Sequence, residues 1–439
     1  MMFNNIFKFT QEKLNFIYEN SLLIQHIDKL IFVSIILVFL LSTEMSSEII
    51  GFVAIIPTFL TLIQILTKPQ DKLEPNRFEL WLLAYFMIVI ISLAGSTLFA
   101  LSLKGFIKTV TYLGFYVSVA HYLKNNKKMI PYLLGAIGVC ISFESIIGIM
   151  QNFAHVDEIS TWQDVSNLNP EQVMTRVYGT LKPLNPNLLG GYFVAGIPAL
   201  FGLGGLFAYE KHYKRLWVTL AFAFLSVITL FLTGCRGSYI GCLVIFAGIF
   251  LVGAKFLWNK YKKVFLSSIA ALFVLAMCAI ISVSSLRARI LSMFAMRQDS
   301  SNSFRFNVYQ SSWQMFQDNW LLGIGIGNKN FREIYGLYMR TGFDALSAYN
   351  IFLETAVESG IFALIAFLGF IVCMLKKGID VILKSNDTKN TIFVSTAVIS
   401  IFALMVHGLV DTVFFRPQIQ FVFWTMTAII SVCTREHCS

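Results

Sequence analysis

The chain has 439 residues, of which 56 % are hydrophobic and only 13 % are charged, and its mean hydropathy is +0.70. A soluble domain would carry about 25 % charged residues, so this composition excludes an ordinary soluble protein and indicates an integral membrane protein. No long polar tract divides the chain. We therefore expect one transmembrane domain, residues 30–434, after a cytoplasmic amphipathic segment, residues 1–29, that lacks a signal-peptide cleavage pattern.

Apolar runs long enough to cross a bilayer recur along the chain. A helix needs about 20 apolar residues to span the hydrocarbon, and only helices satisfy their own backbone groups in lipid at this length. Spans are predicted near 30–45, 48–67, 79–97, 103–123, 129–153, 188–208, 215–233, 238–257, 264–284, 349–375, 391–413 and 417–434. The predicted fold is an all-α polytopic integral membrane protein of about 12 transmembrane helices, with a large outer (periplasmic) loop between helices 9 and 10.

Lysine and arginine residues predict the orientation. With the N-terminus inside, the inner segments hold about 21 of the 34 basic residues, whereas the outer turn 43–48 holds none. Topology thus explains the net charge of +10, which gives no reason to expect nucleic-acid binding. We expect a multi-pass protein of the bacterial inner membrane with both termini in the cytoplasm.

Unusual polar clusters all fall on the predicted outer side. They are the end of loop 154–187, the turn LTGCRGSYIG (232–241), the long loop 285–348 and the turn HGLVDTVFFRPQ (407–418). Scattered structural polar residues would not share one face. Their common side predicts one composite site at the outer membrane boundary.

Glycines flank a single arginine in LTGCRGSYIG. Gly234 and Gly237 let the backbone open and expose its amides, and the fork of Arg236 can bind two oxygens at once. Arg236 is therefore a candidate clamp for an oxyanion or a diphosphate. The alternative is an interfacial arginine that reaches toward lipid headgroups.

Two other outer segments carry basic residues. Asn185 is expected to cap a helix that starts at Pro186, and Arg176 and Lys182 precede it as candidates for an anion site. In the loop 285–348, where arginines outnumber the acids, Arg305 is a further candidate; anionic lipid headgroups are the alternative partner. The glycines of GIGIGN, residues 323–328, follow an amphipathic helical pattern rather than a strand, which excludes a dinucleotide site and indicates a turn.

Ionisable residues within or beside spans are functional candidates because burying them is costly. His407 and Asp411 are four apart and are expected to share a helix face, where Asp411 orients or charges His407. Arg416 is expected to neutralise Asp411. The alternative is a structural pair that ties two helices together.

A second pair of acids lies in NIFLETAVESG, residues 350–360. Glu354 and Glu358 are expected to share a helix face one and two turns below Tyr349. They are candidates for a catalytic base or a proton path, and alternatively for neutralising loop arginines. The seven cysteines are scattered and form no CxxC pair, so neither a metal nor another cofactor is predicted.

Four motifs in this order, RVYGTLKPLNPNLLGGYF, LTGCRGSYIG, GIGIGNKNF and YNIFLETAVESGIFAL, resemble the O-antigen ligase and polymerase superfamily over about residues 175–430. The resemblance implies a metal-independent transfer of glycan from an undecaprenyl-diphosphate carrier to a lipid or protein acceptor at the outer leaflet. It also implies that arginines grip the diphosphate, namely Arg236 together with Arg176 or Arg305. Membrane lipids are the other partners, and the oligomeric state stays open.

The chain departs from the ligases at Tyr349, where they carry a histidine thought to act in proton transfer. A tyrosine with a pKa of about 10 is a poor base at neutral pH, so a hydrogen bond, stacking on a sugar or an interfacial place are its alternative roles. RQDSSNSFRFNVYQ, ALSAYNIFLE and HGLVDTVFFRPQ resemble the IctB-type branch, which also has this tyrosine. That branch implies an alternative function as a transporter or transport accessory for bicarbonate or another small anion. Lys108, Glu144 and His407 lie within predicted spans and are candidates for its path.

Overall fold

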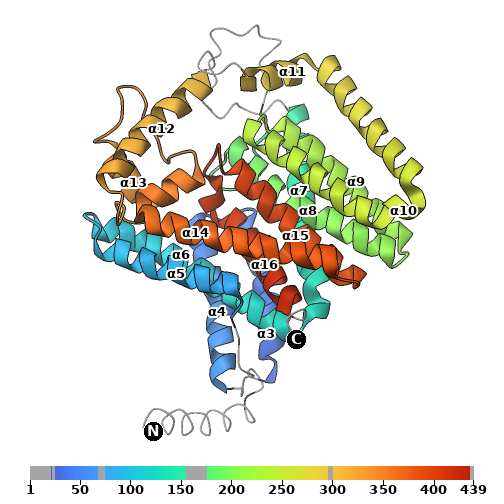
Figure 1. Ribbon diagram of the computed structural model, residues 1–439, viewed down its shortest axis with the longest axis horizontal. Helices are drawn as coiled ribbons and strands as arrows, with labels where there is room; N and C mark the ends of the chain where they lie inside the picture. The colour runs from blue at the N-terminus through green and yellow to red at the C-terminus, as the bar shows by residue number, and fades with distance from the viewer. Residues whose placement is uncertain (1–20, 22–24, 68–74, 155–175, 295–299, 436–439) are drawn as a thin grey trace.

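The computed structural model describes residues 21, 25–67, 75–154, 176–294 and 300–435. Most of the predicted N-terminal segment 1–29, and residues 155–175 of the predicted outer loop 154–187, lie outside these ranges. The described ranges are mainly helical and contain no strand (Figure 1). The first half comprises α3 (Ile27–Ser42), α4 (Ser47–Thr67), α5 (Arg77–Ala94), α6 (Phe99–Asn125), η1 (Lys127–Met129), α7 (Ile130–Ala154), α8 (Pro186–Tyr209) and α9 (Tyr213–Leu232).

The second half continues with α10 (Arg236–Ser282), α11 (Ser284–Leu291), η3 (Ser292–Phe294), α12 (Ser300–Asp318), α13 (Asn328–Tyr335), α14 (Ile351–Lys384), α15 (Thr388–His407), η5 (Val413–Phe415) and α16 (Pro417–Thr434). α10 is broken at Tyr261 and covers two predicted spans. In the described ranges, 9 helical segments are long and apolar enough to cross a membrane. This confirms the all-α polytopic prediction; the count of about 12 also needs α3, α6 and α16 and stays a prediction.

α16 lies at the centre of the bundle. All its residues are buried, and α6, α8, α14 and α15 pack around it (Figure 1). Its Phe421 meets Phe115 of α6 edge-on, with ring centroids 4.8 Å apart, and Gln420 donates to the carbonyl of Phe414 at 2.9 Å. Because protein rather than lipid surrounds α16, it accommodates polar side chains that satisfy one another.

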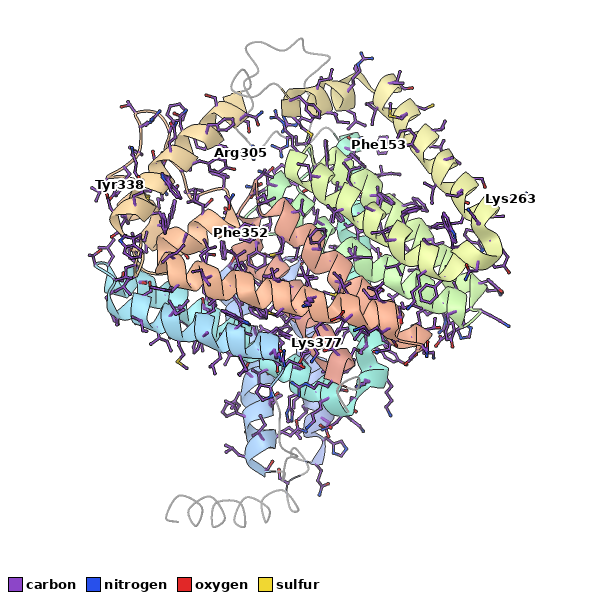
Figure 2. The ribbon with its side chains drawn as sticks, viewed as in Figure 1. Phe153, Lys263, Arg305, Tyr338, Phe352 and Lys377 are labelled. Atoms are coloured by element: carbon purple, nitrogen blue, oxygen red, sulfur yellow. The ribbon has the colours of Figure 1, made fainter. Side chains whose placement is uncertain are left out.

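Contacts between residues far apart in the sequence define the two ends of the helical bundle. At one end, which we call the site end, Thr180 contacts the carbonyl of Thr43 after α3 at 2.9 Å. At the opposite end, Arg435 pairs with Glu79 at 3.1 Å. Figure 2 shows Arg305 at the site end and Lys377 toward the opposite end. Contacts join described residues of all four predicted polar clusters at the site end.

A break in α14 receives the glycine-rich loop. Gly360 has a φ of +78° and interrupts the helix, which frees main-chain groups on both sides of it. Ile324 and Gly325 donate to the carbonyls of Val357 and Glu358 at 3.0 and 2.9 Å, and Ile361 donates to the carbonyl of Trp320 at 2.9 Å. The glycines therefore form a turn, as predicted, and this turn completes a broken transmembrane helix.

Replacing Gly360 with alanine should destabilise the protein. The positive φ disfavours any Cβ, and a Cβ built there would lie 2.2 Å from the carbonyl oxygen of Leu321, so we expect a cost of about 1–3 kcal/mol. Gly51→Ala is the matched control, because a Cβ at Gly51 has no neighbour within 4 Å. The midpoint of thermal unfolding should fall in Gly360→Ala and stay near wild type in Gly51→Ala; equal midpoints would contradict the role of the break.

Candidate functional site

The turn between α9 and α10 is the centre of the site. α9 ends at Leu232, and Gly234 reverses the chain with a φ of +61°, a conformation that favours glycine. The side chain of Arg176 lies over this turn, since a Cβ built on Gly234 would be 3.2 Å from Cγ of Arg176. Glycine is thus required both for the turn and for the close approach of the arginine.

Two arginines bind the main chain of this turn. Arg176 donates from Nε to the carbonyl of Thr233 at 2.8 Å and from Nη2 to Oδ1 of Asn187 at 2.5 Å. Arg289, which follows α10, donates from Nε to the carbonyl of Gly234 at 2.9 Å. Arg289 is not among the predicted site residues, because nothing in its sequence neighbourhood shows that α11 returns to this turn.

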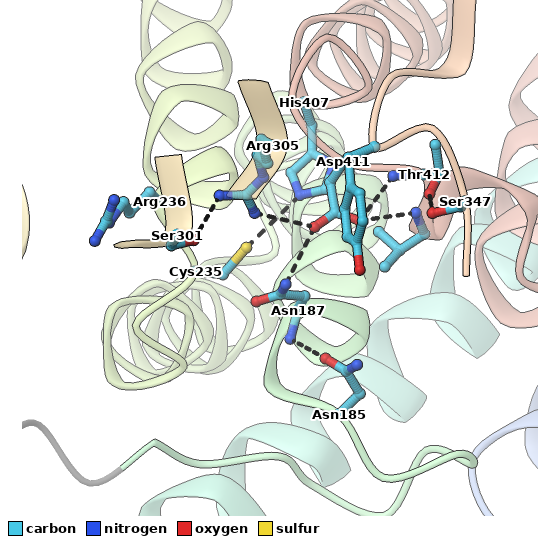
Figure 3. Close-up of polar contacts among 12 residues, drawn as sticks. Asn185, Asn187, Cys235, Arg236, Ser301, Arg305, Ser347, His407, Asp411 and Thr412 are labelled. Atoms are coloured by element: carbon cyan, nitrogen blue, oxygen red, sulfur yellow. Dashed lines mark hydrogen bonds and ion pairs between the residues drawn. The ribbon is translucent and has the colours of Figure 1, made fainter. Parts of the chain in front are cut away.

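Two further arginines, Arg236 and Arg305, bond neighbouring residues at the start of α12 (Figure 3). Arg236, the first residue of α10, donates from Nη1 to Oδ1 of Asn302 at 3.2 Å, and Arg305 donates from Nη1 to Oγ of Ser301 at 3.0 Å. The N-terminus of α10 adds the positive end of its helix dipole. We call Arg176, Arg236, Arg289 and Arg305 the arginine cluster.

The members of the cluster act on one another electrostatically. Burial, followed by the positive charges of Arg176 and Arg236, lowers the pKa of Arg289 to about 10. Burial is also the main cause of the lowered pKa of Arg176, and Arg305 lowers it further. A bound anion with several oxygens would relieve this repulsion and accept their forked hydrogen bonds.

Asp411 is held beside the cluster as a hydrogen-bond acceptor (Figure 3). It is 3 % exposed. Its Oδ1 accepts the amides of Thr412 and Val413 at 2.7 and 3.1 Å, and its Oδ2 accepts from Nδ2 of Asn187 at 3.2 Å. Nη2 of Arg305 lies 3.9 Å from Oδ2. Four donors therefore face this one carboxylate, which fixes its position beside the cluster.

The start of α8 explains how Asn187 reaches the site. Asn185 caps the helix by accepting the amide of Asn187 at 2.7 Å, and Pro186 is the first helical residue, which confirms that prediction. The side-chain amide of Asn187 then joins Arg176 through its oxygen to Asp411 through its nitrogen. In the sequence, this role is indicated only by position: Asn187 is the second residue of a helix that Asn185 caps.

His407 and Asp411 do not share a helix face, so that prediction is wrong. α15 ends at His407, and a Cβ on Gly408 would lie 2.5 Å from Cδ1 of Ile351. The chain leaves the helix at this close approach, and the carboxylate of Asp411 bonds the amides of its own turn. His407 instead places Nε2 3.9 Å from Sγ of Cys235, and both side chains are buried.

Tyr349 packs beneath Arg305. It has a φ of +51° and precedes Asn350, which caps α14. Cζ of Arg305 lies 5.7 Å from the centroid of the tyrosine ring, and Phe304 meets that ring edge-on with centroids 5.8 Å apart. Burial, followed by the charge of Asp411, raises the pKa of Tyr349 to about 12. This phenol stays protonated, so its geometry suits positioning of Arg305 rather than base catalysis.

Tyr349→Phe should therefore preserve any activity of the site, whereas Tyr349→Ala should reduce it. The reason is that Tyr349 supports Arg305 through its ring and not through its hydroxyl. We expect the phenylalanine variant to stay within about twofold of wild type and the alanine variant to lose about tenfold or less, the scale of one cation–π contact. Rates for both variants across pH 6–9 provide the measurement. An equal loss in both variants would assign the hydroxyl a direct role.

Glu354 and Glu358 are buried on α14, on one face as predicted, and each holds a loop. Oε2 of Glu354 accepts the amide of Ala348 at 2.9 Å, and Oε1 of Glu358 accepts the amide of Gly327 at 2.9 Å. In the described ranges neither forms an ion pair with an arginine. Their contacts support an anchoring role for the two segments that flank α13.

Lys182 and Arg416 lie apart from the arginine cluster. The side chain of Lys182 is exposed, and its carbonyl accepts from Gln418 at 2.9 Å. Arg416 occupies the N-cap position of α16. The ion pair of Asp411 is with Arg305, so the structure does not place Arg416 as its neutralising partner.

The candidates for a transport path have separate surroundings. Oε2 of Glu144, within α7, accepts the amide of Thr180 at 3.0 Å and so holds the segment before α8. Lys108 lies on α6 and His407 beside Cys235. No contact joins these three residues to one another in the described ranges. Within the same ranges, no three His, Cys, Asp or Glu side chains gather closely enough to hold a metal ion.

Comparison with known protein families identifies a similarity in the second half of the chain. Residues 221–368 match the family model described as O-antigen ligase, a range that contains Arg236, Arg289, Arg305 and Tyr349 but not Arg176, His407 or Asp411. No curated protein matches the chain. The chain is thus similar to the O-antigen ligase family from α9 to the middle of α14, which supports an O-antigen ligase or polymerase-like membrane protein.

Proposed function

We propose that the protein transfers a glycan from an undecaprenyl-diphosphate carrier to an acceptor hydroxyl at the outer leaflet of the bacterial inner membrane. The observation that carries the proposal is that four arginines from four parts of the chain lie within electrostatic range of one another. Two of them, Arg176 and Arg289, bond the carbonyls of the turn 233–235. A diphosphate offers several charged oxygens in the geometry that guanidinium groups bind best. The match to the O-antigen ligase family model supports the same substrate class.

The proposed orientation places the site end outside. Lysines and arginines crowd the segments 124–128, 211–215, 255–263 and 376–389. Lys389 pairs with Glu210 at 2.6 Å and Lys255 donates to the carbonyl of Ser385 at 3.3 Å, so the last three of these segments meet at the opposite end. Cytoplasmic loops carry such an excess of positive charge. Both termini would then lie in the cytoplasm.

The chemistry assigns a role to each group. The acceptor oxygen bonds to the anomeric carbon of the donor sugar, and the bond from that carbon to the diphosphate breaks. Undecaprenyl diphosphate leaves with the electron pair, and the arginine cluster stabilises its growing charge. Asp411 takes the proton of the acceptor hydroxyl, because it is the carboxylate that pairs with the cluster among the described residues.

The test uses purified protein in liposomes with an undecaprenyl-diphosphate-linked oligosaccharide. We expect saturable binding and release or transfer of glycan, both of which Arg236→Ala weakens. Arg332→Ala is the matched control, because Arg332 is exposed and pairs with Asp344 at 3.1 Å. Absence of binding together with entry of labelled bicarbonate would overturn the transferase and favour the transport alternative.

A further inference from the structure

A cysteine and a histidine lie beside the arginine cluster, and the proposed transfer uses neither of them. Cys235 directly precedes α10, and its amide donates to Oγ1 of Thr233 at 3.2 Å. Its carbonyl accepts two amides of the first turn of α10. The main chain of Cys235 is therefore fixed in the turn 233–235, whose other two carbonyls bind Arg176 and Arg289.

The ring of His407 is held between two helices that approach each other at glycines. A Cβ on Gly237 of α10 would lie 3.3 Å from Nε2 of His407, and a Cβ on Gly191 of α8 would lie 3.5 Å from its Cε1. Nε2 lies 3.9 Å from Sγ of Cys235, which makes the two buried side chains a hydrogen-bonded pair (Figure 3). The packing of α8 and α10 thus fixes the imidazole against the thiol.

Charged side chains from several elements surround this pair. Asp411 lies within electrostatic range of both of its members. The sulfur of Cys235 in turn acts on the guanidinium groups of Arg176 and Arg289. In the described ranges, the charged and titratable side chains around the pair are Arg176, Arg236, Tyr239, Arg289, Arg305 and Asp411. Four of the six are arginines, so the surroundings favour a negative charge on the sulfur.

The thiol of Cys235 is more acidic than an ordinary cysteine. Burial raises its pKa, but the hydrogen bond and the charge of His407 outweigh burial and lower the pKa to about 7. The start of α10 acts in the same direction, because a helix N-terminus stabilises a thiolate. At neutral pH the sulfur is therefore partly ionised, and its negative charge reduces the repulsion between Arg176 and Arg289.

We propose that Cys235 and His407 are positioning residues that couple diphosphate binding to the uptake of one proton. In the empty site, the ionised sulfur is paired with the imidazolium of His407 and supplies a negative charge that stabilises the arginine cluster. A diphosphate brings its own negative charge, so the thiolate takes up a proton from solvent as the diphosphate binds. The inference rests on the proposed diphosphate site and adds the pH dependence of that site.

The direction of this pH dependence follows from linkage. A rise in pH through the pKa of the thiol fills the site with a negative charge that competes with the diphosphate. Affinity for a diphosphate should therefore fall as the pH rises, and a serine in place of Cys235 should remove this fall. A merely structural role of the pair would instead change the affinity by the same factor at every pH.

Ionisation of the sulfur is measured first, without any ligand. A thiolate absorbs ultraviolet light that a thiol does not, so the absorbance difference between wild type and Cys235→Ser is recorded across the neutral range. We expect a thiolate signal with a midpoint at about pH 7, which His407→Gln moves to higher pH. Cys242→Ser, which removes another buried thiol of α10, should keep the wild-type signal. Absence of a thiolate at neutral pH in the wild type overturns the proposal.

Binding of inorganic pyrophosphate then tests the coupling. Calorimetry on the purified protein gives the dissociation constants of wild type and Cys235→Ser, and their ratio cancels the protonation of pyrophosphate itself. We expect a ratio close to one at about pH 6 and of about ten at about pH 8, because the wild type must take up one proton. A ratio that does not change with pH, or absence of pyrophosphate binding, overturns the coupling.

The outcomes separate this inference from the proposed transferase. Pyrophosphate binding needs neither lipid nor acceptor, so a ratio that changes with pH in a protein that transfers no glycan would support the coupled site and overturn the transferase. Glycan transfer together with a constant ratio would do the reverse. His407→Gln is the second variant if Cys235→Ser fails to fold, since it should also lose the fall in affinity between about pH 6 and 8.

Discussion

Arg305→Ala should lower kcat/KM for glycan transfer by about 10²–10³-fold, the usual cost of removing one donor to a developing negative charge. Arg305 lies 3.9 Å from Asp411, and its guanidinium packs on the ring of Tyr349. Its loss removes a diphosphate contact and leaves Asp411 without its ion-pair partner. Initial rates at varied donor concentration provide the measurement.

Lysine at this position is the informative second variant. Arg305→Lys keeps the charge but lacks the planar fork, so we expect a rate between those of wild type and the alanine variant. Arg332→Ala, which removes an exposed arginine of the same loop, should behave as wild type. Wild-type rates in Arg305→Ala would refute the place of this guanidinium in the site.

Asp411→Asn should lower kcat by about 10²–10⁴-fold, the range attributed to general base catalysis. The amide keeps nearly the same shape but can no longer take the acceptor proton. Because one negative charge beside the arginine cluster is lost, donor affinity should hold or rise. The prediction is therefore a fall in kcat with a donor KM that is unchanged or lower.

The control for this variant is Asp318→Asn, an acid of the same loop that accepts from Tyr338 at 2.9 Å and lies outside the arginine cluster. Asp411→Glu should recover part of the rate, because a carboxylate is restored. A lower donor affinity in Asp411→Asn would show that Asp411 serves the structure of the cluster, and His407 would become the next candidate base.

The fold class was predictable because a helix that spans the bilayer needs a long apolar run, which is visible in the sequence. Apolar runs coincide with helices in the described ranges, and contacts join three of the basic segments at one end. The break in α14 was not predicted. Nothing around Gly360 shows that a loop from elsewhere in the chain satisfies the freed backbone groups, since that information lies in the tertiary contact with residues 320–325.

The site was predictable in part. The structure places Arg176, Arg236, Arg305 and Asp411 together, as expected for residues that share one side of the membrane. The prediction that His407 and Asp411 share a helix face was wrong. Residues four apart share a face only where the helix continues through both, and α15 ends at His407. Arg289 and Asn187 were missed, since their roles depend on where α11 and α8 lie relative to the turn 233–235.

The insertion of residues 320–327 into α14 has a practical consequence for exchanging parts between related chains. The polar loop before α14 forms main-chain hydrogen bonds with this helix on both sides of Gly360. A graft that stops at Asn350, just before α14 begins, would therefore combine a loop from one protein with a helix break from another. A chimera intended to alter glycan preference should therefore transplant residues 300–361 as one block, with its second junction beyond the break.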